Sequence, residues 1–255
     1  MEFADERFAP ERFVLLVAGA SKGLGRAIAE SWARPGTRIA IAARGEAALR
    51  STRDRLVQRG AEVVALAGDV GERGFADRLV GAAETALGPV SHLCVCASSL
   101  GAVPLRPIVD VEDAQWDEAV RTNILGTVRL LRAVLPGMQG DLGGGRLLVF
   151  SSDAAVEAYP RWGPYGATKA AADHVVRVLA EELQERRVPN VYAYAVDPGD
   201  MDTDLHRAAV ADADPLALAR PAAVAPLILS LLLRVPPLPS GRYIASELAA
   251  GGGPR

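Results

Sequence analysis

The chain is poor in the residues that most often build metal centres and disulfide frameworks. It has 2 cysteines and 3 histidines among 255 residues. The cysteines, Cys94 and Cys96, lie in an apolar stretch, and we interpret them as small buried hydrophobic residues rather than as a disulfide or a metal pair. The histidines, His92, His174 and His206, form no metal-binding motif. A metal enzyme is therefore not expected.

Two further absences limit the partners and the location of the protein. The net charge is −3, so the sequence predicts no basic surface for nucleic acid or for an anionic membrane. The longest apolar stretch near the C-terminus, Ala222 to Leu233, is too short to cross a bilayer. The first residues, Met1 to Arg7, are acidic and lack the pattern of a secretion signal. We therefore expect a cytoplasmic protein that acts on a small molecule.

Lysine is the scarcest charged residue. Lysine and arginine together number 28, yet only two of them, Lys22 and Lys169, are lysine. The two residue types differ in geometry and in pKa, so a position that keeps lysine in an arginine-rich chain suggests a specific task. Both lysines occur in segments that predict a cofactor site. The alternative is that they are ordinary surface residues.

A strand, a loop and a helix in the middle of the chain carry the main chemical signal. The apolar run Leu147 to Phe150 predicts a buried strand that places Ser152 at its carboxyl end. The following helix carries Tyr165 and Lys169 one turn apart on the same face. A nearby ammonium lowers the pKa of a tyrosine, so Tyr165 is a candidate acid/base and Lys169 its activator.

A glycine-rich turn near the N-terminus predicts a phosphate site. The apolar strand Val14 to Val17 runs into the turn Ala18 to Gly25, and a helix follows. Such a turn presents backbone N–H groups and the positive end of a helix to a phosphate. After the next expected strand, Thr37 to Ala43, Arg44 stands where NAD-binding folds hold an acid. Arg44 and Lys22 therefore favour NADP(H), unless Arg44 is simply a solvated residue at a strand end.

The alternation of strands and helices predicts the fold. The other expected strands are 62–67, 92–97, 147–150, 191–196 and 242–245, and the expected helices are 26–33, 46–59, 72–87, 111–138, 163–187 and 222–233. This pattern predicts one α/β domain over residues 1–255, with a doubly wound parallel sheet of about seven strands and helices on both faces. Residues 203–221 are expected to form a short substrate lid. Ligands of such sheets bind at the carboxyl ends of the strands.

Taken together, the motifs resemble the short-chain dehydrogenase/reductase family in its compact single-domain branch, which has a Rossmann-type fold. The resemblance extends from Val14 to about Ile244. The matching elements are the TGxxxGxG-like loop Ala18–Gly25 with Ala18 in place of threonine, the acidic motif Asp69-Val70, the helix residue Asn123, the Ser152, Tyr165 and Lys169 set with its YxxxK spacing, and the segment Pro198–Thr203.

The resemblance implies a mechanism and four catalytic residues. Tyr165 would give a proton to a carbonyl oxygen while hydride arrives from the nicotinamide. Lys169 would lower the pKa of Tyr165 and bond the nicotinamide ribose, and Ser152 would stabilise the developing oxyanion. Asn123 would hold a water that links Lys169 to solvent. The predicted activity is reversible, NADPH-dependent reduction of a ketone or aldehyde to an alcohol.

The resemblance also implies the cofactor contacts. The residues expected to contact NADP(H) are Gly19, Ser21, Lys22, Gly23, Leu24, Gly25, Arg44, Asp69, Val70, Ala97, Ser98, Tyr165, Lys169, Pro198, Gly199, Met201 and Thr203. A homo-oligomer is expected from the resemblance alone, either a homotetramer paired through the helices of Asn123 and Tyr165 or a dimer.

The substrate pocket is expected beside these residues. Ser152, Tyr159, Trp162 and His206 are the candidate substrate contacts, with Met201 nearby. They suit an aromatic or flat cyclic carbonyl compound. The alternative is that the aromatic residues only pack the lid.

One segment departs from the family pattern. Where the family usually has Asn-Asn-Ala-Gly, this chain has Cys96-Ala97-Ser98-Ser99. We expect a working enzyme with a slightly altered pocket, and we keep a non-catalytic NADP(H)-binding regulator as the alternative. A sugar epimerase or dehydratase of the extended branch is rejected, because its substrate domain needs more chain than follows Gly199.

Overall fold

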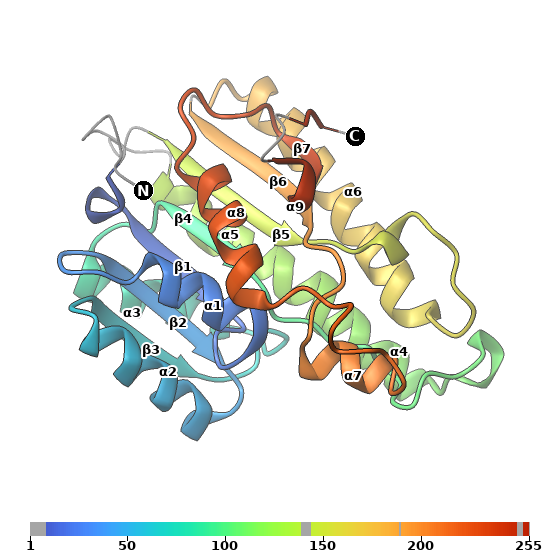
Figure 1. Ribbon diagram of the computed structural model, residues 1–255. Helices are drawn as coiled ribbons and strands as arrows, with labels where there is room; N and C mark the ends of the chain where they lie inside the picture. Colours follow the sequence, from blue (N-terminus) through green and yellow to red (C-terminus); the bar gives the residue numbers. More distant parts are fainter. Residues whose placement is uncertain (1–8, 139–143, 189, 249–251, 255) are drawn as a thin grey trace.

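A parallel β-sheet forms the centre of the computed structural model, which describes residues 9–138, 144–188, 190–248 and 252–254. Within these residues the sheet has seven strands in the order β3-β2-β1-β4-β5-β6-β7 (Figure 1). The strands are β1 (Val14–Ala18), β2 (Arg38–Ala43), β3 (Glu62–Ala67), β4 (His92–Val95), β5 (Gly145–Phe150), β6 (Val191–Asp197) and β7 (Gly241–Ile244). All neighbouring strands pair in parallel. The predicted doubly wound sheet is confirmed, and its order reverses between β1 and β4.

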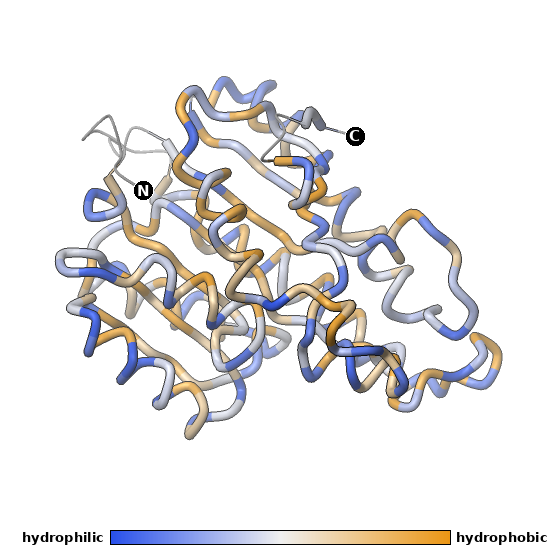
Figure 2. The backbone as a smooth tube through the Cα atoms, viewed as in Figure 1, coloured by the Kyte–Doolittle hydropathy of each residue, from blue (hydrophilic) through white to orange (hydrophobic). Residues whose placement is uncertain are grey.

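Helices cover both faces of the sheet, and each face has its own hydrophobic core. On one face lie α1 (Gly23–Trp32), α2 (Glu46–Gln58) and α8 (Pro221–Leu232). On the other lie α3 (Phe75–Leu87), α5 (Thr127–Met138) and α6 (Gly163–Glu185). β1 is buried along its whole length, which explains its continuous apolar sequence (Figure 2). β5 is equally buried, although it includes Arg146.

The structure differs from the prediction at several elements: α1 begins at Gly23 rather than at Arg26, and β4 ends at Val95 rather than at Ala97. Helix α3 begins at Phe75 rather than at Glu72, because Gly74 has a φ of 78° and cannot continue a helix. The long helix expected over 111–138 consists of α4 (Asp113–Ala119), a π-helix (Val120–Gly126) and α5. The expected irregular lid contains a short helix, α7 (Asp204–Ala209), and another short helix, α9 (Ala245–Leu248), follows β7.

The two cysteines face the same core. Cys94 lies on β4 and Cys96 just beyond it, and residues two apart on a strand share a face. Both contact the cluster under α1 and α8, both are free thiols, and burial raises the pKa of each. The interpretation as a small buried residue is confirmed for Cys94, whereas Cys96 is partly buried. In the described part of the chain, no helix is long and apolar enough to span a membrane.

A buried histidine lies at the amino end of β4, away from the strand ends where ligands bind. His92 is 3% exposed, and its ring lies 4.7 Å from the Phe13 ring and 5.5 Å from the Trp32 ring, centre to centre. Its Nε2 atom lies 3.2 Å from the Leu232 carbonyl oxygen. Burial, assisted by the nearby charge of Arg146, lowers the pKa of His92 to about 3. The imidazole is therefore neutral in the folded protein.

We predict that His92 makes the protein sensitive to acid. The unfolded chain binds a proton at this histidine below a pKa of about 6.5, whereas the folded chain does so only near pH 3. Stability that is present above about pH 6.5 is therefore lost as the pH falls toward 3, by up to about 1.4 kcal/mol per pH unit. Urea unfolding at several pH values measures this slope. His92→Gln should show a smaller slope, and equal slopes would contradict the prediction.

Candidate active site

Ser152 lies where the sequence predicted it, just beyond the carboxyl end of β5. Its hydroxyl donates to Asp153 Oδ1 at 2.8 Å and accepts from the Ala154 backbone N–H at 3.2 Å. The Asp153 Oδ2 atom accepts a hydrogen bond from the Tyr159 hydroxyl at 2.8 Å. Burial acts to raise the pKa of Asp153, but the hydrogen bonds from Tyr159 and Ser152 outweigh it and the pKa is lowered. Asp153 is thus a carboxylate bonded to the candidate oxyanion-stabilising hydroxyl.

Tyr165 and Lys169 lie one turn apart on α6 and are both buried, at 8% and 6% exposed. The Lys169 Nζ atom donates to the Phe150 carbonyl oxygen at 2.6 Å and lies 5.4 Å from the centre of the Tyr165 ring. Burial lowers the pKa of Lys169 to about 8, against the opposing effect of the Asp173 carboxylate.

The expected lowering of the Tyr165 pKa by Lys169 is wrong for this structure. Burial raises the pKa of Tyr165, and the hydrogen bond with Ser152 opposes that rise only in part. The ammonium of Lys169 bonds a backbone carbonyl instead of the phenol oxygen. Helical spacing places the two side chains near each other, but desolvation of the buried phenol decides the direction in which the Tyr165 pKa shifts.

Asn123 lies in the π-helix, and its side chain forms hydrogen bonds with the loop Cys96–Ser99, which departs from the family pattern. Its Nδ2 atom donates to the Ser99 carbonyl and to Thr168 Oγ1, both at 2.8 Å. Its Oδ1 atom accepts from the Ser99 N–H at 2.8 Å and from Ser98 Oγ at 3.2 Å. These bonds use both donor hydrogens and both acceptor sites of the amide. The side chain therefore has no group left for the water that the resemblance implies.

The glycine-rich turn between β1 and α1 fits a dinucleotide phosphate. Gly19 has a φ of 91°, and a Cβ there would lie 2.5 Å from the Ala97 nitrogen, so only glycine permits this approach. Helix α1 has no side-chain cap at its N-terminus, where Ser21, Gly23 and Leu24 lie. The first N–H groups of the helix therefore face outward with no side chain on them, as a phosphate site requires.

The two predicted phosphate-binding cations lie at the rim of this groove in exposed ion pairs. The Lys22 Nζ atom is 2.9 Å from Asp204 Oδ2 on α7. The Arg44 Nη1 atom, just after β2, is 3.8 Å from Glu118 Oε1 on α4. Both lysine and arginine side chains are 65% exposed. A phosphate would therefore compete with carboxylates that are weakly held.

The other predicted cofactor residues follow the carboxyl ends of β3, β4 and β6. Asp69 lies 3.4 Å from Arg121 Nη2 and accepts a hydrogen bond from the Gly71 N–H at 2.8 Å. Val70 is buried against the π-helix at Gly126. The segments after β4 and β6 also carry Ala97, Ser98, Pro198, Gly199, Met201 and Thr203, whereas Gly25 lies in α1, after β1. The predicted set is therefore gathered along one edge of the sheet.

A pocket opens between Ser152, Tyr165 and the lid. The residues that line it are Ser151, Ser152, Asp153, Trp162, Tyr165, Asp197, Pro198, Gly199, Asp200, Met201, Thr203, Leu205 and His206. Trp162 stacks edge-on against Tyr165 with ring centres 5.6 Å apart. Tyr159 does not line the pocket, but its ring packs edge-on against Trp162 at 6.4 Å. The His206 Nδ1 atom lies 3.7 Å from the Asp200 Oδ1 atom.

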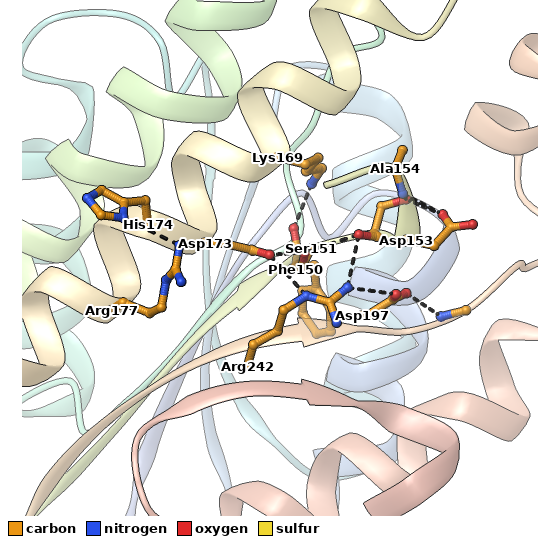
Figure 3. A network of polar contacts seen from close by, with 12 residues as sticks. Phe150, Ser151, Asp153, Ala154, Lys169, Asp173, His174, Arg177, Asp197 and Arg242 are labelled. Atoms are coloured by element: carbon orange, nitrogen blue, oxygen red, sulfur yellow. Dashed lines mark hydrogen bonds and ion pairs between the residues drawn. The ribbon is translucent and has the colours of Figure 1, made fainter. Parts of the chain in front are cut away.

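Sequence reasoning missed four charged residues around this pocket. Asp153 and Asp197 line it, and Asp197 belongs with Asp173 and Arg242 to a buried network of ion pairs (Figure 3). Asp173 had a local signal, because it follows Lys169 by one helical turn. Arg242 had none, since it lies 69 residues further along the chain from the carboxylate it contacts.

Comparison with known proteins decides the family. A family model for short chain dehydrogenases matches residues 13–214. The chain belongs to this family. Its members are nicotinamide-dependent oxidoreductases, so the chain is an NAD(P)-dependent short-chain dehydrogenase/reductase.

Individual relatives agree with this assignment. A glycine betaine reductase of Emericella nidulans is 34% identical over 75% of this chain, which spans 15% of that protein. A short chain dehydrogenase of Pseudocercospora fijiensis is 33% identical over 77% of this chain, which spans 64% of that protein. A short chain dehydrogenase from Shigella flexneri in complex with NADP is 25% identical, with a TM-score of 0.84 over 94% of this chain and 100% of its own.

We predict that Asn123 stabilises the loop after β4 and thereby the cofactor groove. Asn123→Leu removes four hydrogen bonds and leaves buried partners unsatisfied, so the free energy of unfolding should fall by about 2–4 kcal/mol and NADPH should bind more weakly. Urea unfolding and fluorescence titration measure the two effects. The matched control is Asn190→Gly at the exposed, positive-φ turn before β6, which should change neither. If the two variants have the same free energy of unfolding and the same NADPH affinity, Asn123 does not stabilise this loop.

Proposed function

We propose that this dehydrogenase is a reversible, NADPH-dependent carbonyl reductase that converts a ketone or aldehyde to an alcohol. The observation that carries the proposal is that Ser152 and Tyr165 line one pocket, with Lys169 buried one helical turn from Tyr165. Buried groups of this kind are costly to keep without a function, and perturbed pKa values at a pocket mark catalytic sites. The direction of the reaction depends on supply and demand in the cell.

The residues of the pocket divide the chemistry between them. The substrate oxygen would lie between Ser152 and Tyr165, where the serine hydroxyl turns from Asp153 to donate to it and stabilises negative charge. Tyr165 then gives its proton to this oxygen. Lys169, whose Nζ atom lies 5.4 Å from the centre of the Tyr165 ring, is a cation beside the phenolate that remains. The nicotinamide cofactor, held along the glycine-rich turn and the ends of β4 and β6, supplies the hydride.

The choice of NADP(H) over NAD(H) is supported by the rim of the groove. Lys22 and Arg44 lie there, and the position after β2 carries no acid to bind a ribose hydroxyl. The Shigella flexneri relative was solved as a complex with NADP. Two cations and no carboxylate after β2 suit a phosphate better than a hydroxyl.

The pocket walls support an uncharged aromatic or cyclic substrate. Trp162 offers an aromatic face next to Tyr165, and Met201 and Leu205 add apolar surface. Asp153 and Asp200 border the same space, so they repel anionic carbonyl compounds such as keto acids. His206, at the lid, is a further candidate contact.

A lid and an assembly complete the proposal. Residues 203–221 would act as the lid, since α7 ties back to the glycine-rich turn through Asp204 and Lys22. A cytoplasmic homotetramer through the helices of Asn123 and Tyr165 agrees with the exposed apolar side chains of Leu125 and Val178, each 43% exposed.

A non-catalytic NADP(H)-binding regulator is the competing proposal. It was favoured by the replacement of Asn-Asn-Ala-Gly with Cys96 to Ser99. The Asn123 side chain, however, forms hydrogen bonds with the Ser99 N–H and the Ser99 carbonyl, and these support the loop in the absence of the usual asparagines. The observation that favoured a regulator is thereby weakened.

The deciding experiment is the consumption of NADPH with a panel of uncharged aromatic ketones, diketones and quinones. We expect turnover by the wild type, and a loss of roughly 100-fold or more in kcat in Tyr165→Phe, because the proton donor is removed. The phenyl ring keeps the packing, so NADPH affinity should be retained in this variant. NADPH binding without any turnover by the wild type would favour the regulator.

The cofactor preference has its own test. Arg44→Gln should raise the KM for NADPH at least about tenfold and leave the KM for NADH nearly unchanged, because only NADPH carries the phosphate that the guanidinium would bind. The matched control is Arg50→Gln, which removes an exposed arginine on α2 that is paired with Glu46. If the KM values for NADPH and NADH rise by the same factor, Arg44 does not bind the phosphate that distinguishes the two cofactors.

A further inference from the structure

One guanidinium lies at the centre of a buried network beside the catalytic residues (Figure 3). The side chain of Arg242, on β7, is 10% exposed. Its Nε atom lies 3.1 Å from Asp173 Oδ2, and its Nη2 atom lies 3.1 Å from Asp197 Oδ2. The same Nη2 atom donates to the Ser152 carbonyl oxygen at 3.1 Å. The guanidinium therefore contacts three separate segments of the chain at once.

Each carboxylate carries this contact on to a catalytic element. Asp173 follows Lys169 by one turn on α6, and its Oδ2 atom also accepts from Ser151 Oγ at 2.7 Å. Asp197 ends β6, and its Oδ1 atom accepts from the Gly199 N–H at 3.0 Å. The end of β5, the turn after β6 and helix α6 are thus joined through a single side chain from β7.

The same network surrounds the catalytic ammonium. The groups that face Lys169 are Asp173 and Tyr165 on α6, Asp197 on β6, Cys96 after β4 and the Phe150 carbonyl on β5. Among them, Asp173 acts most strongly to raise the pKa of Lys169 against the lowering caused by burial. The guanidinium bonds both carboxylates and keeps them ordered beside the ammonium.

We propose that Arg242 and Asp173 are positioning residues of the active site. The guanidinium holds the Ser152 backbone and helix α6 in register, and the Asp173 carboxylate supplies the counter-charge of Lys169. Neither residue lines the pocket, so both act through Ser152 and Lys169. The kinetic consequence rests on the proposed reductase function, whereas the electrostatic consequence does not.

Stability alone does not account for this network. A buried ion pair is often no more stabilising than apolar residues of similar size, because both charges lose their hydration. Within the described part of the chain, Asp173 Oδ1 is buried with no hydrogen-bond partner, which adds a further cost. Burial raises the pKa of both Asp173 and Asp197. A costly charged cluster next to the catalytic lysine is explained by what it does to that lysine.

The scarcity of lysine makes the electrostatic part directly measurable. With lysine isotopically labelled at the ε-carbon, the NMR spectrum of the full chain contains two lysine signals, from Lys22 and Lys169. The wild-type Lys169 signal should titrate near pH 8. In Asp173→Asn the midpoint should fall by roughly one pH unit, because the ammonium loses a neighbouring negative charge. The exposed Lys22 is the internal reference and should not move.

The positioning part is tested by removing both charges of the pair together. A variant that combines Arg242→Gln with Asp173→Asn removes one charge of each sign. Asp197 loses its ion pair with Arg242 but keeps the Gly199 N–H and the nearby charge of Lys169, so the variant should fold and bind NADPH. Its kcat should fall about tenfold or more, because a small displacement of reacting groups is enough for such a loss. The matched control combines Arg50→Gln with Glu46→Gln, which removes both charges of an exposed pair on α2 and should leave kcat unchanged.

The outcomes separate this proposal from the proposed function. An unmoved Lys169 signal in folded Asp173→Asn overturns the counter-charge role, whatever the substrate is. Unchanged kcat in the paired Arg242 variant overturns the positioning role. A wild type that reduces no carbonyl compound contradicts the reductase function, while a shifted Lys169 signal would still support the role of Asp173.

Discussion

The active site depends on the burial of one ammonium group. Lys169 is removed from water by the ends of β4, β5 and β6, and an ammonium in such a place is stable only if nearby groups replace its hydration. The Phe150 carbonyl supplies one hydrogen bond, and Asp173 and Asp197 supply negative charge. Those carboxylates are buried in turn and need a cation, which Arg242 provides. Strand β7 is thus linked to helix α6 by the ion pair between Arg242 and Asp173.

The loop after β4 shows which part of a family motif the fold requires. Gly19 packs its backbone directly on Ala97, so the requirement at this point is a small residue and a close approach. The asparagines of the usual motif are absent, and Asn123 bonds the Ser98 and Ser99 positions instead. A π-helix places this amide, and such insertions are frequent at functional sites. In this chain the side chain of Asn123 therefore holds the loop at Ser98 and Ser99.

The fold was largely predictable because the strands are covered on both faces, which makes runs such as Val14 to Ala18 continuously apolar. Tyr165 and Lys169 were predictable because helical spacing is local. The π-helix Val120–Gly126 and the contact between Arg242 and Asp173 were not, since both are set by packing between distant segments. The pKa of Tyr165 was predicted in the wrong direction for a related reason. Sequence spacing indicates which groups are neighbours, whereas desolvation depends on everything that covers them.

The ion pairs of the two predicted phosphate-binding cations differ from the buried network in their exposure to solvent. Lys22 with Asp204 and Arg44 with Glu118 are exposed, and such pairs contribute about 1 kcal/mol or less. A phosphate carries more charge than a carboxylate and offers more acceptor oxygens, so it can displace these partners at little cost. The carboxylates meanwhile keep both cations extended over the groove. The ion pairs of Lys22 and Arg44 are therefore exposed, whereas the two ion pairs of Arg242 are buried near Lys169.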